Sequence, residues 1–185
     1  MDRYSIVFQP PELVLNEIKA MKAVLAEKIG WYHSKNSLGH ITICEFETTE
    51  EPLVIIKRKL KRICATIDAV DVVLNNFNSY PNGAFFIAPD ATSTLSLKTI
   101  MKEVTTELGL KNSYKSNAPH LSIGRKLSEE QLQMANQLFT TIHLTFIAKG
   151  LVLRKLDTTK KQFEAIDYFP FEGNSHLKPV QGVLF

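Results

Sequence analysis

Hydrophobic and polar residues follow an order along this chain that occurs twice. Each half opens with a short apolar run that a proline ends, and continues with a stretch of helical spacing that a glycine closes. These features lie at residues 4–8, Pro10, 12–29 and Gly30 in the first half, and at residues 84–87, Pro89, 94–108 and Gly109 in the second. A short apolar run is typical of a strand, and apolar residues at every third or fourth position predict a helix. Each half is therefore predicted to begin with a strand and a helix.

A histidine motif follows the predicted helix in each half. It reads histidine, apolar, hydroxyl, apolar, and it occurs as His40-Ile41-Thr42-Ile43 and as His120-Leu121-Ser122-Ile123. Successive side chains of a strand point to opposite faces. In each motif the histidine and the hydroxyl therefore share one face, and the aliphatic residues share the other. We interpret the two motifs as short strands that meet at one active site.

A third copy of the motif, at residues 143–146, has to be distinguished from these two. Matching landmarks of the two halves are 79 positions apart for the prolines and for the helix-closing glycines, and 80 positions apart for His40 and His120. His143 falls instead where the first half has Asp68. A repeat in register predicts that a pseudo-twofold axis brings His40 and His120 together, and that His143 is structural or faces solvent.

The rest of the pattern predicts the fold class. Strands are expected at residues 67–77, within 141–156 with a break at Gly150, and at 162–169; helices at 53–63 and from 128; turns or loops at 78–83, 111–118 and 157–161. Hairpins beside alternating strands and helices favour an α+β fold with two antiparallel sheets over a doubly wound parallel sheet. We expect a single bilobal domain over residues 1–185, an internal duplication with approximate repeats at 3–79 and 83–169 and a tail at 170–185.

Composition narrows the class of protein. A length of 185 residues with 44% hydrophobic content is enough for one sizeable core. The net charge of +3 tolerates an anionic ligand but does not by itself indicate nucleic-acid binding. The two cysteines, Cys44 and Cys64, have no metal-binding or redox spacing. No signal peptide and no apolar run of about 20 residues is visible, so we expect a cytoplasmic protein that does not bind membranes. We also expect it to be a monomer.

The paired histidines and hydroxyls suit acid–base chemistry at phosphorus. One imidazole can be neutral and the other protonated near neutral pH, so that one takes a proton from the attacking hydroxyl and the other gives one to the leaving oxygen. Thr42 and Ser122 can donate hydrogen bonds to the non-bridging phosphate oxygens. Zinc normally takes three protein ligands or more, and the motifs supply two imidazoles, so no metal and no other cofactor is expected.

The two motifs, their spacing and the repeat around them resemble the 2H phosphoesterase superfamily over residues 4–169. The form Pro119-His120-Leu121-Ser122-Ile123-Gly124-Arg125 is most similar to the 2′-5′ RNA ligase / RNA 2′,3′-cyclic phosphodiesterase family. The resemblance implies a bilobal fold with a central cleft and a metal-free site that acts on 2′,3′-cyclic phosphates or 2′-5′ linkages of RNA ends or small nucleotides. It also implies catalytic roles for His40 and His120, and phosphate binding by Thr42 and Ser122. Arg125 matches an arginine that this family places near the phosphate.

Three positions near the motifs carry further expectations. Strict alternation places Arg125 on the face opposite His120, so it reaches the site only if the strand ends or bends at Gly124. Gly124 itself falls on the site face, where it would leave room for a ligand. Cys44-Glu45 departs from the small and apolar residues usual after the first motif, and alternation turns Glu45 away from the cleft.

Several alternatives stay open at this stage. The same cleft could hold RNA ends or a nucleotide without turnover, and the intact motifs favour the enzyme over such a binding module. The physiological substrate and the favoured direction, hydrolysis or ligation, are not determined. The basic residues of the helix at 53–63 either attract a phosphate backbone or form a solvated face. The loop at 31–38 either holds a nucleobase or covers the core. Candidate stacking partners are Trp31, Tyr32, Tyr80, Phe85 and Tyr114.

Overall fold

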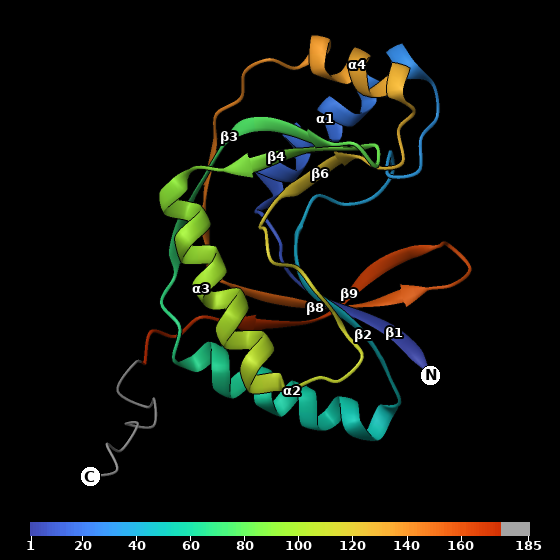
Figure 1. Cartoon of the computed structure of the whole chain (residues 1–185). Coiled ribbons are helices and arrows are strands. Elements are labelled where there is room, and N and C mark those ends of the chain that lie inside the picture. Colours follow the sequence, from blue (N-terminus) through green and yellow to red (C-terminus); the bar gives the residue numbers. More distant parts are fainter. Residues whose placement is uncertain (175–185) are drawn as a thin grey trace.

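The computed structural model describes residues 1–174, which form one curled antiparallel sheet and four helices (Figure 1). The strands are β1 (Asp2–Phe8), β2 (Ile41–Thr48), β3 (Val70–Tyr80), β4 (Ala84–Pro89), β5 (Tyr114–Lys115), β6 (Leu121–Gly124), β7 (Leu144–Ala148), β8 (Gly150–Asp157) and β9 (Gln162–Pro170). The helices are α1 (Glu12–Ile29), α2 (Glu50–Ala65), α3 (Ala91–Leu108) and α4 (Glu129–Leu138). The predicted α+β class is confirmed.

The sheet consists of two halves that meet at the histidine motifs. The strand order is β7-β3-β4-β6-β2-β1-β8-β9, and β5 pairs with β2 off this path. We call β7-β3-β4-β6 the β4 half-sheet and β2-β1-β8-β9 the β1 half-sheet. A single residue pair, Ile41 with Leu121, joins β2 to β6. The two sheets expected from the sequence are thus continuous through their motif strands, and the curl of the sheet brings β3, β4 and β6 across from β8 and β9 (Figure 1).

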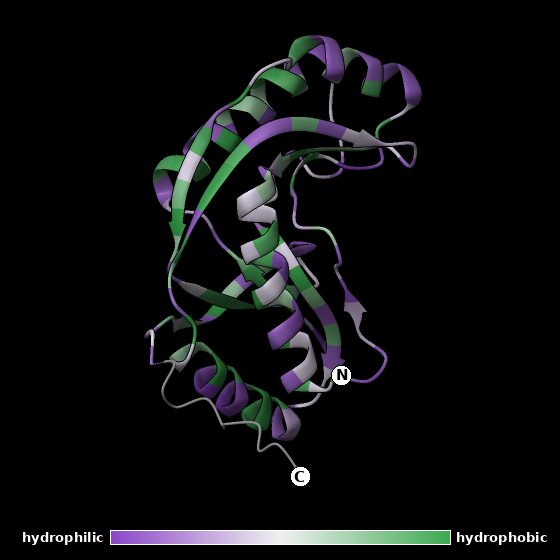
Figure 2. Cartoon of the chain, turned by 60° about the vertical axis from the view of Figure 1, so that its left-hand side comes forward, coloured by the Kyte–Doolittle hydropathy of each residue, from purple (hydrophilic) through white to green (hydrophobic). Residues whose placement is uncertain are grey.

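The helices cover the outside of the sheet, and local sequence signals explain their positions and ends. In α1 the buried residues Val14, Ile18, Lys22 and Leu25 recur at helical spacing. The carboxylate of Asp90 caps α3 by accepting a hydrogen bond from the Ser93 amide at 2.7 Å, so this helix begins at Ala91 rather than near residue 94. Ser128 and Gln131 form a reciprocal capping box at the start of α4. Figure 2 shows hydrophobic and hydrophilic residues side by side along the helices, as expected when one face packs on a sheet.

Two loops differ from the sequence-based expectation. Residues 78–80 continue β3, because the hairpin to β4 closes over only three residues, with Tyr80 still paired to Ala84. Gly83 makes that tight turn with a φ of 83°, and its amide donates to the Tyr80 carbonyl. The loop at 111–118 contains the short strand β5, which pairs with β2.

The two half-sheets and the helices share one hydrophobic core. Tyr4, Phe8, Phe85 and Ile87 are among its fully buried members. Part of the predicted tail joins this body, since the amides of residues 172–174 donate to carbonyls of residues 64–67; the remainder of the tail lies outside the described residues. Among residues 1–174, no helix combines the length and the apolar character that a membrane span requires.

Candidate active site

A cavity of about 1060 Å³ lies between the two half-sheets, and we call it the central cavity. Segments from all parts of the chain line it: the loop at 31–38, the start of β2, the β3–β4 turn, the residues after β6, and the β8–β9 hairpin. Of the sequence-predicted site residues, His40, His120, Ser122 and Arg125 are in this lining. The structure therefore brings together the two motifs, which are 80 positions apart in the chain.

The two histidines are held by the same local hydrogen bond. The Nδ1 atom of His40 lies 2.6 Å from the carbonyl oxygen of Leu38, and the Nδ1 atom of His120 lies 2.8 Å from that of Ala118. A carbonyl oxygen can only accept, so in both imidazoles Nδ1 carries the proton and Nε2 is left for a ligand. The bond joins residues two positions apart in both cases, as expected if the motifs have one backbone conformation.

The surroundings of the two imidazoles differ. Burial and the positive charge of Arg154 lower the pKa of His40 to about 3, with smaller effects of Lys22 and Arg125 in the same direction. His40 is therefore neutral at physiological pH. His120 lies against aromatic rings instead, 5.0 Å from the ring centre of Phe86 and 6.4 Å from that of Tyr80.

Both motif strands carry a β-bulge, at the same position. On β2, Thr42 pairs with Val7 and Cys44 pairs with Ile6, which leaves Ile43 as the extra residue. On β6, Ser122 pairs with Phe86 and Gly124 pairs with Phe85, which leaves Ile123 as the extra residue. A bulge inserts one residue into the alternation of faces. Every side chain beyond it in the motif strand therefore lies on the face opposite to the one that strict alternation predicts.

The bulges correct three expectations drawn from strict alternation. Arg125, five positions after His120, lines the central cavity, and so does Glu45, five positions after His40. Glu45 was expected to point away from the cleft; its carboxylate lies inside and pairs with Arg3. Gly124 was expected on the site face, but it is buried on the core face, where an added Cβ would come within 2.7 Å of the Leu127 side chain. Gly124 therefore leaves room for the core and not for a ligand.

Two buried cations near the cavity were missed by the sequence analysis. Arg154, on β8, lines the cavity and is 4% exposed. Lys22, on α1, is 2% exposed and donates to the carbonyl oxygens of Ser34 and Ser37, both of which line the cavity. The signal for Arg154 was a single arginine after three aliphatic residues of a strand, and the signal for Lys22 was its place in the apolar pattern of the helix.

Thr42 is partly buried on β2 and, among the described residues, is not one of those that line the cavity. The candidate stacking residues divide clearly: Trp31, Tyr80 and Tyr114 are exposed and line the cavity, whereas Phe85 lies in the core. Tyr32 also borders the cavity but is 3% exposed, and its hydroxyl donates to the Lys22 carbonyl. Within residues 1–174, no group of three His, Cys, Asp or Glu side chains is placed to hold a metal ion.

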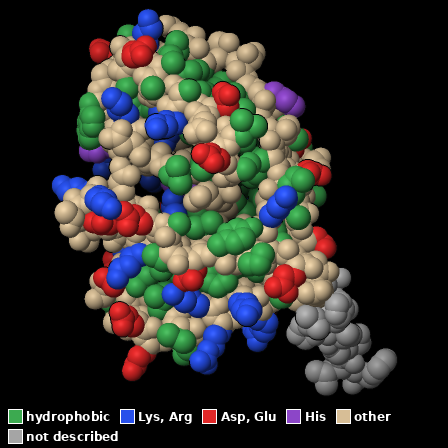
Figure 3. All heavy atoms as spheres, turned by 180° about the vertical axis from the view of Figure 1, so that it is seen from behind, with side chains coloured by type: hydrophobic (Ala, Val, Ile, Leu, Met, Phe, Trp, Pro, Cys, Tyr) green, Lys and Arg blue, Asp and Glu red, His purple; other side chains and the backbone are tan. Residues whose placement is uncertain are grey.

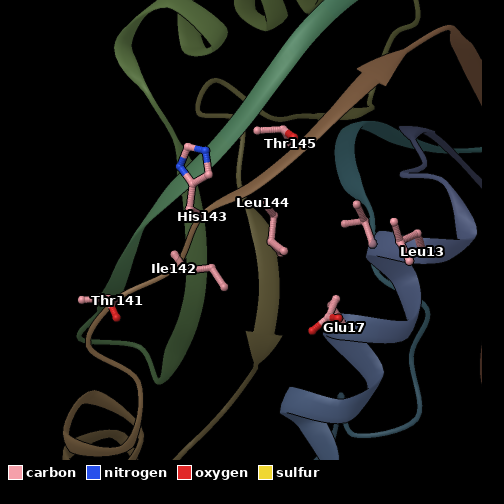
Figure 4. Close-up of a pocket in the computed structure, with 8 residues that line it drawn as sticks. Leu13, Glu17, Thr141, Ile142, His143, Leu144 and Thr145 are labelled. Carbon is pink, nitrogen blue, oxygen red and sulfur yellow. The ribbon is translucent and has the colours of Figure 1, made fainter.

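Two sequence features with possible functional roles, His143 and the basic residues of α2, lie outside the lining of the central cavity. His143 is exposed and borders a separate hollow between the start of α1 and residues 141–145. Leu13 and Glu17 line this hollow from the helix (Figure 4). The basic residues of α2 do not line the central cavity; Lys57 pairs with Asp167, and Arg62 pairs with Glu107. Basic and acidic side chains are interspersed on the face seen in Figure 3. These observations agree with a solvated helix face.

Comparisons with known proteins find a family profile and solved structures that are similar to this chain. The profile described as the 2′-5′ RNA ligase superfamily matches residues 10–160. Among solved structures, LigT of E. coli in its apo form superposes with a TM-score of 0.66 at 13% identity, over 91% of this chain and 96% of that one. The structure of TT0787 of Thermus thermophilus gives 0.61 at 15% identity, over 94% and 100% of the two chains.

A third similar structure is Usb1 of Kluyveromyces marxianus, with a TM-score of 0.54 at 12% identity, over 91% of this chain and 97% of that one. LigT of E. coli has also been crystallised in complex with 3′-AMP. A search of curated protein sequences found no match. The solved structures share the fold, and the profile covers most of the sequence. The resemblance to the 2H phosphoesterases is thereby confirmed, and the chain belongs to the 2′-5′ RNA ligase superfamily.

Proposed function

We propose that the protein is a phosphodiesterase that acts on RNA 2′,3′-cyclic phosphate ends or on 2′-5′ phosphodiester linkages, with His40 and His120 as its acid–base pair. One observation carries the proposal: both imidazoles line the same cavity, and each has its Nδ1 proton bonded to a carbonyl oxygen two residues earlier. This arrangement presents two Nε2 atoms to one ligand. General acid and general base catalysis each typically contribute about 10²–10⁴-fold.

The roles follow from the difference between the two imidazoles. Neutral His40 accepts the proton of the attacking water at Nε2, while the water oxygen bonds to phosphorus. The bond from phosphorus to one ribose oxygen breaks, and protonated His120 gives its proton to that oxygen. Ser122, which lines the cavity, donates a hydrogen bond to a non-bridging oxygen, and Arg125 neutralises the charge of these oxygens. In ligation a ribose hydroxyl replaces water as the attacking group, and the two histidines keep these roles.

The test is hydrolysis of nucleoside 2′,3′-cyclic phosphates and of RNA ending in a cyclic phosphate, with EDTA present. We expect the wild type to be active and His40→Ala and His120→Ala each to lose at least about 10²-fold in kcat. His143→Ala, an exposed histidine outside the cavity, is the matched control and keeps full activity. The position of the phosphate in the product shows which ribose oxygen leaves.

The result that contradicts the proposal is equally definite. If the wild type binds the RNA end but does not hydrolyse it, and neither alanine variant changes that binding, the cavity is a binding site without turnover. Because a single chain supplies both histidines and Arg125 to the cavity, we also propose that the monomer is the active species. Sedimentation at the concentration of the assay tests this second point.

A further inference from the structure

The two half-sheets place different side chains at equivalent positions beside the central cavity. In the β1 half-sheet, β1 lies between β2 and β8, and in the β4 half-sheet, β4 lies between β6 and β3. Ile6 on β1 and Phe85 on β4 are the residues that pair with the motif strand just after its bulge. The residues that precede them are Ser5 on β1 and Ala84 on β4. Ser5 pairs with Arg154 on β8, and Ala84 pairs with Tyr80 on β3. Arg154 and Tyr80 therefore occupy matching places, and both line the cavity.

Two contacts hold Arg154 at this place. Its Nε atom donates to the Ser5 hydroxyl at 3.0 Å, and its guanidinium carbon lies 5.2 Å from the centre of the Phe163 ring. The side chain is 4% exposed. Among residues 1–174 its two Nη groups have no hydrogen-bond partner. A guanidinium offers five N–H donors in a fixed fork, so most of its donors remain for a ligand.

Within the described part of the chain, no carboxylate is bonded to Arg154 to neutralise its charge. Glu45 is the acidic residue whose charge acts on it, and that carboxylate already pairs with Arg3. Burial lowers the pKa of Arg154 to about 10, so the guanidinium is still charged at pH 7. A buried charge without a hydrogen-bonded counter-ion is costly to maintain. An anionic ligand in the cavity would supply the missing partner.

We propose that Arg154 binds the phosphoryl oxygens of the substrate on the His40 side of the central cavity. Tyr80, at the matching place, then borders the nucleoside on the His120 side, where the rings of Phe86 and Tyr80 lie. The identification of the anion as a phosphoryl group rests on the proposed function. A planar guanidinium matches phosphate with two parallel hydrogen bonds, which a lysine cannot reproduce.

Titration of the intact protein with inorganic phosphate and with 3′-AMP by calorimetry tests the proposal without turnover. Arg154→Met keeps the length of the side chain and removes its charge; we expect it to weaken binding of both ligands by about 10- to 100-fold, the effect of removing hydrogen bonds from a charged donor. Arg154→Lys should recover only part of the loss. Lys98→Met, an exposed cation on α3 that is not in the cavity lining, is the matched control, with a change below about three-fold.

A purely structural role would give a different pattern. Exchange of a buried charge for an apolar side chain of similar size is often neutral for stability, and circular dichroism checks that Arg154→Met is folded. If it does not fold, Arg154→Lys and Ser5→Ala decide the question: both should bind phosphate more weakly than the wild type, and unchanged affinity in both overturns the proposal. A wild type that binds neither ligand overturns it as well.

Kinetics separate this inference from the proposed function. In the active enzyme, Arg154→Met should raise KM for a cyclic-phosphate end and also move the acid limb of kcat/KM to higher pH, because the positive charge beside His40 is gone. The other charged groups acting on His40 are Lys22 of α1 and Arg125 after β6, and they are unchanged in this variant. If no hydrolysis is found but the phosphate titrations follow the expected order, the proposed function fails and the phosphate-binding role of Arg154 stands.

Discussion

Replacement of Lys22 by methionine is expected to loosen the wall of the central cavity without unfolding the protein. Lys22 lies on α1 and is 2% exposed. Its Nζ atom donates to the Ser34 carbonyl at 3.1 Å, to the Ser37 carbonyl at 2.7 Å and to the Ser37 hydroxyl at 3.0 Å. All three donors of the ammonium group are thus used to tie the loop at 31–38, which lines the cavity, to the helix.

Two opposing terms set the effect on stability. Burial and the charge of Arg125 lower the pKa of Lys22 from 10.5 to about 8, which corresponds to a cost of about 3 kcal/mol for keeping the ammonium charged in the folded state. Methionine removes that cost, but it also removes three hydrogen bonds worth about 1 kcal/mol each. The Ser34 carbonyl still accepts from the Ser37 amide and hydroxyl. The net change is therefore within about 1–2 kcal/mol of zero, or a few degrees in Tm for a chain of this size.

The stability of the wild type relative to Lys22→Met is expected to change with pH in a defined direction. Between pH 8 and 10.5 the unfolded chain holds the Lys22 proton and the folded chain does not, so the stability of the wild type rises with pH in this window. The difference in unfolding free energy between wild type and Lys22→Met should accordingly shift by about 2–3 kcal/mol in favour of the wild type from pH 8 to 10.5. Urea unfolding of both proteins across that range measures it, and other groups that titrate there cancel in the difference.

The loop provides the second readout. Amide hydrogen exchange at Lys35 and Ser37, whose N–H groups close the turns of the loop, should accelerate in Lys22→Met while the strands keep their protection. A fall in Tm beyond about 10 °C, which is well outside the balance worked out above, would refute the reasoning. So would a difference in stability that stays constant from pH 8 to 10.5.

Three further predictions concern single positions. Gly83→Ala should cost about 2–4 kcal/mol in urea unfolding, because a Cβ there lies 2.3 Å from the Leu127 carbonyl oxygen at a φ of 83°; Gly109→Ala, at a φ of 60° with nothing nearer than 3.9 Å, should cost only about 1 kcal/mol, and equal costs would contradict the clash. Glu45→Gln should tighten binding of inorganic phosphate about two- to five-fold by removing a like charge from the cavity, and weaker binding in calorimetry would mean that the carboxylate supports the site. His40, with its pKa lowered to about 3, should remain neutral from pH 8 to pH 5, so its imidazole ¹⁵N signals should not shift in that range; a titration midpoint near 6.5 would show that burial does not act as described.

Local signals were sufficient to predict the helices and every strand except the two-residue β5. Proline and glycine set the ends of α1, and the pattern of apolar residues identified every helix. What local signals could not supply was the pairing of distant strands, such as β1 with β8, because that choice depends on which apolar faces find each other in the folded chain. The repeat supplied part of the missing information, since equal offsets between landmarks predicted that His40 and His120 would meet at one cavity.

Strict alternation agrees with the places of His40, His120 and Ser122 in the cavity lining, and it fails beyond the bulges. The sequence of residues 40–43 and 120–123 contains no glycine or proline that would mark an inserted residue, so strict alternation was the natural expectation. The bulges arise from pairing: two residues of the motif strand face one residue of its neighbour. The sides assigned to Glu45 and Arg125 changed for this single reason. Arg154 was missed because its local signal, an arginine after three aliphatic residues, does not show whether the side chain is buried or exposed.

The two halves share one backbone arrangement around the motif histidines, so only the side chains that differ between the halves can give the two imidazoles different protonation states. Two imidazoles in identical surroundings would titrate together, whereas the proposed reaction needs one neutral and one protonated. The backbone of each half delivers a histidine, a hydroxyl at the second following position and a bulge at the third. At the matching places around them the chain has Arg154 on one side and Tyr80 on the other. Burial, together with the charge of Arg154, lowers the pKa of His40. In the proposed reaction the repeat therefore positions the pair, and the departures from the repeat distinguish its two members.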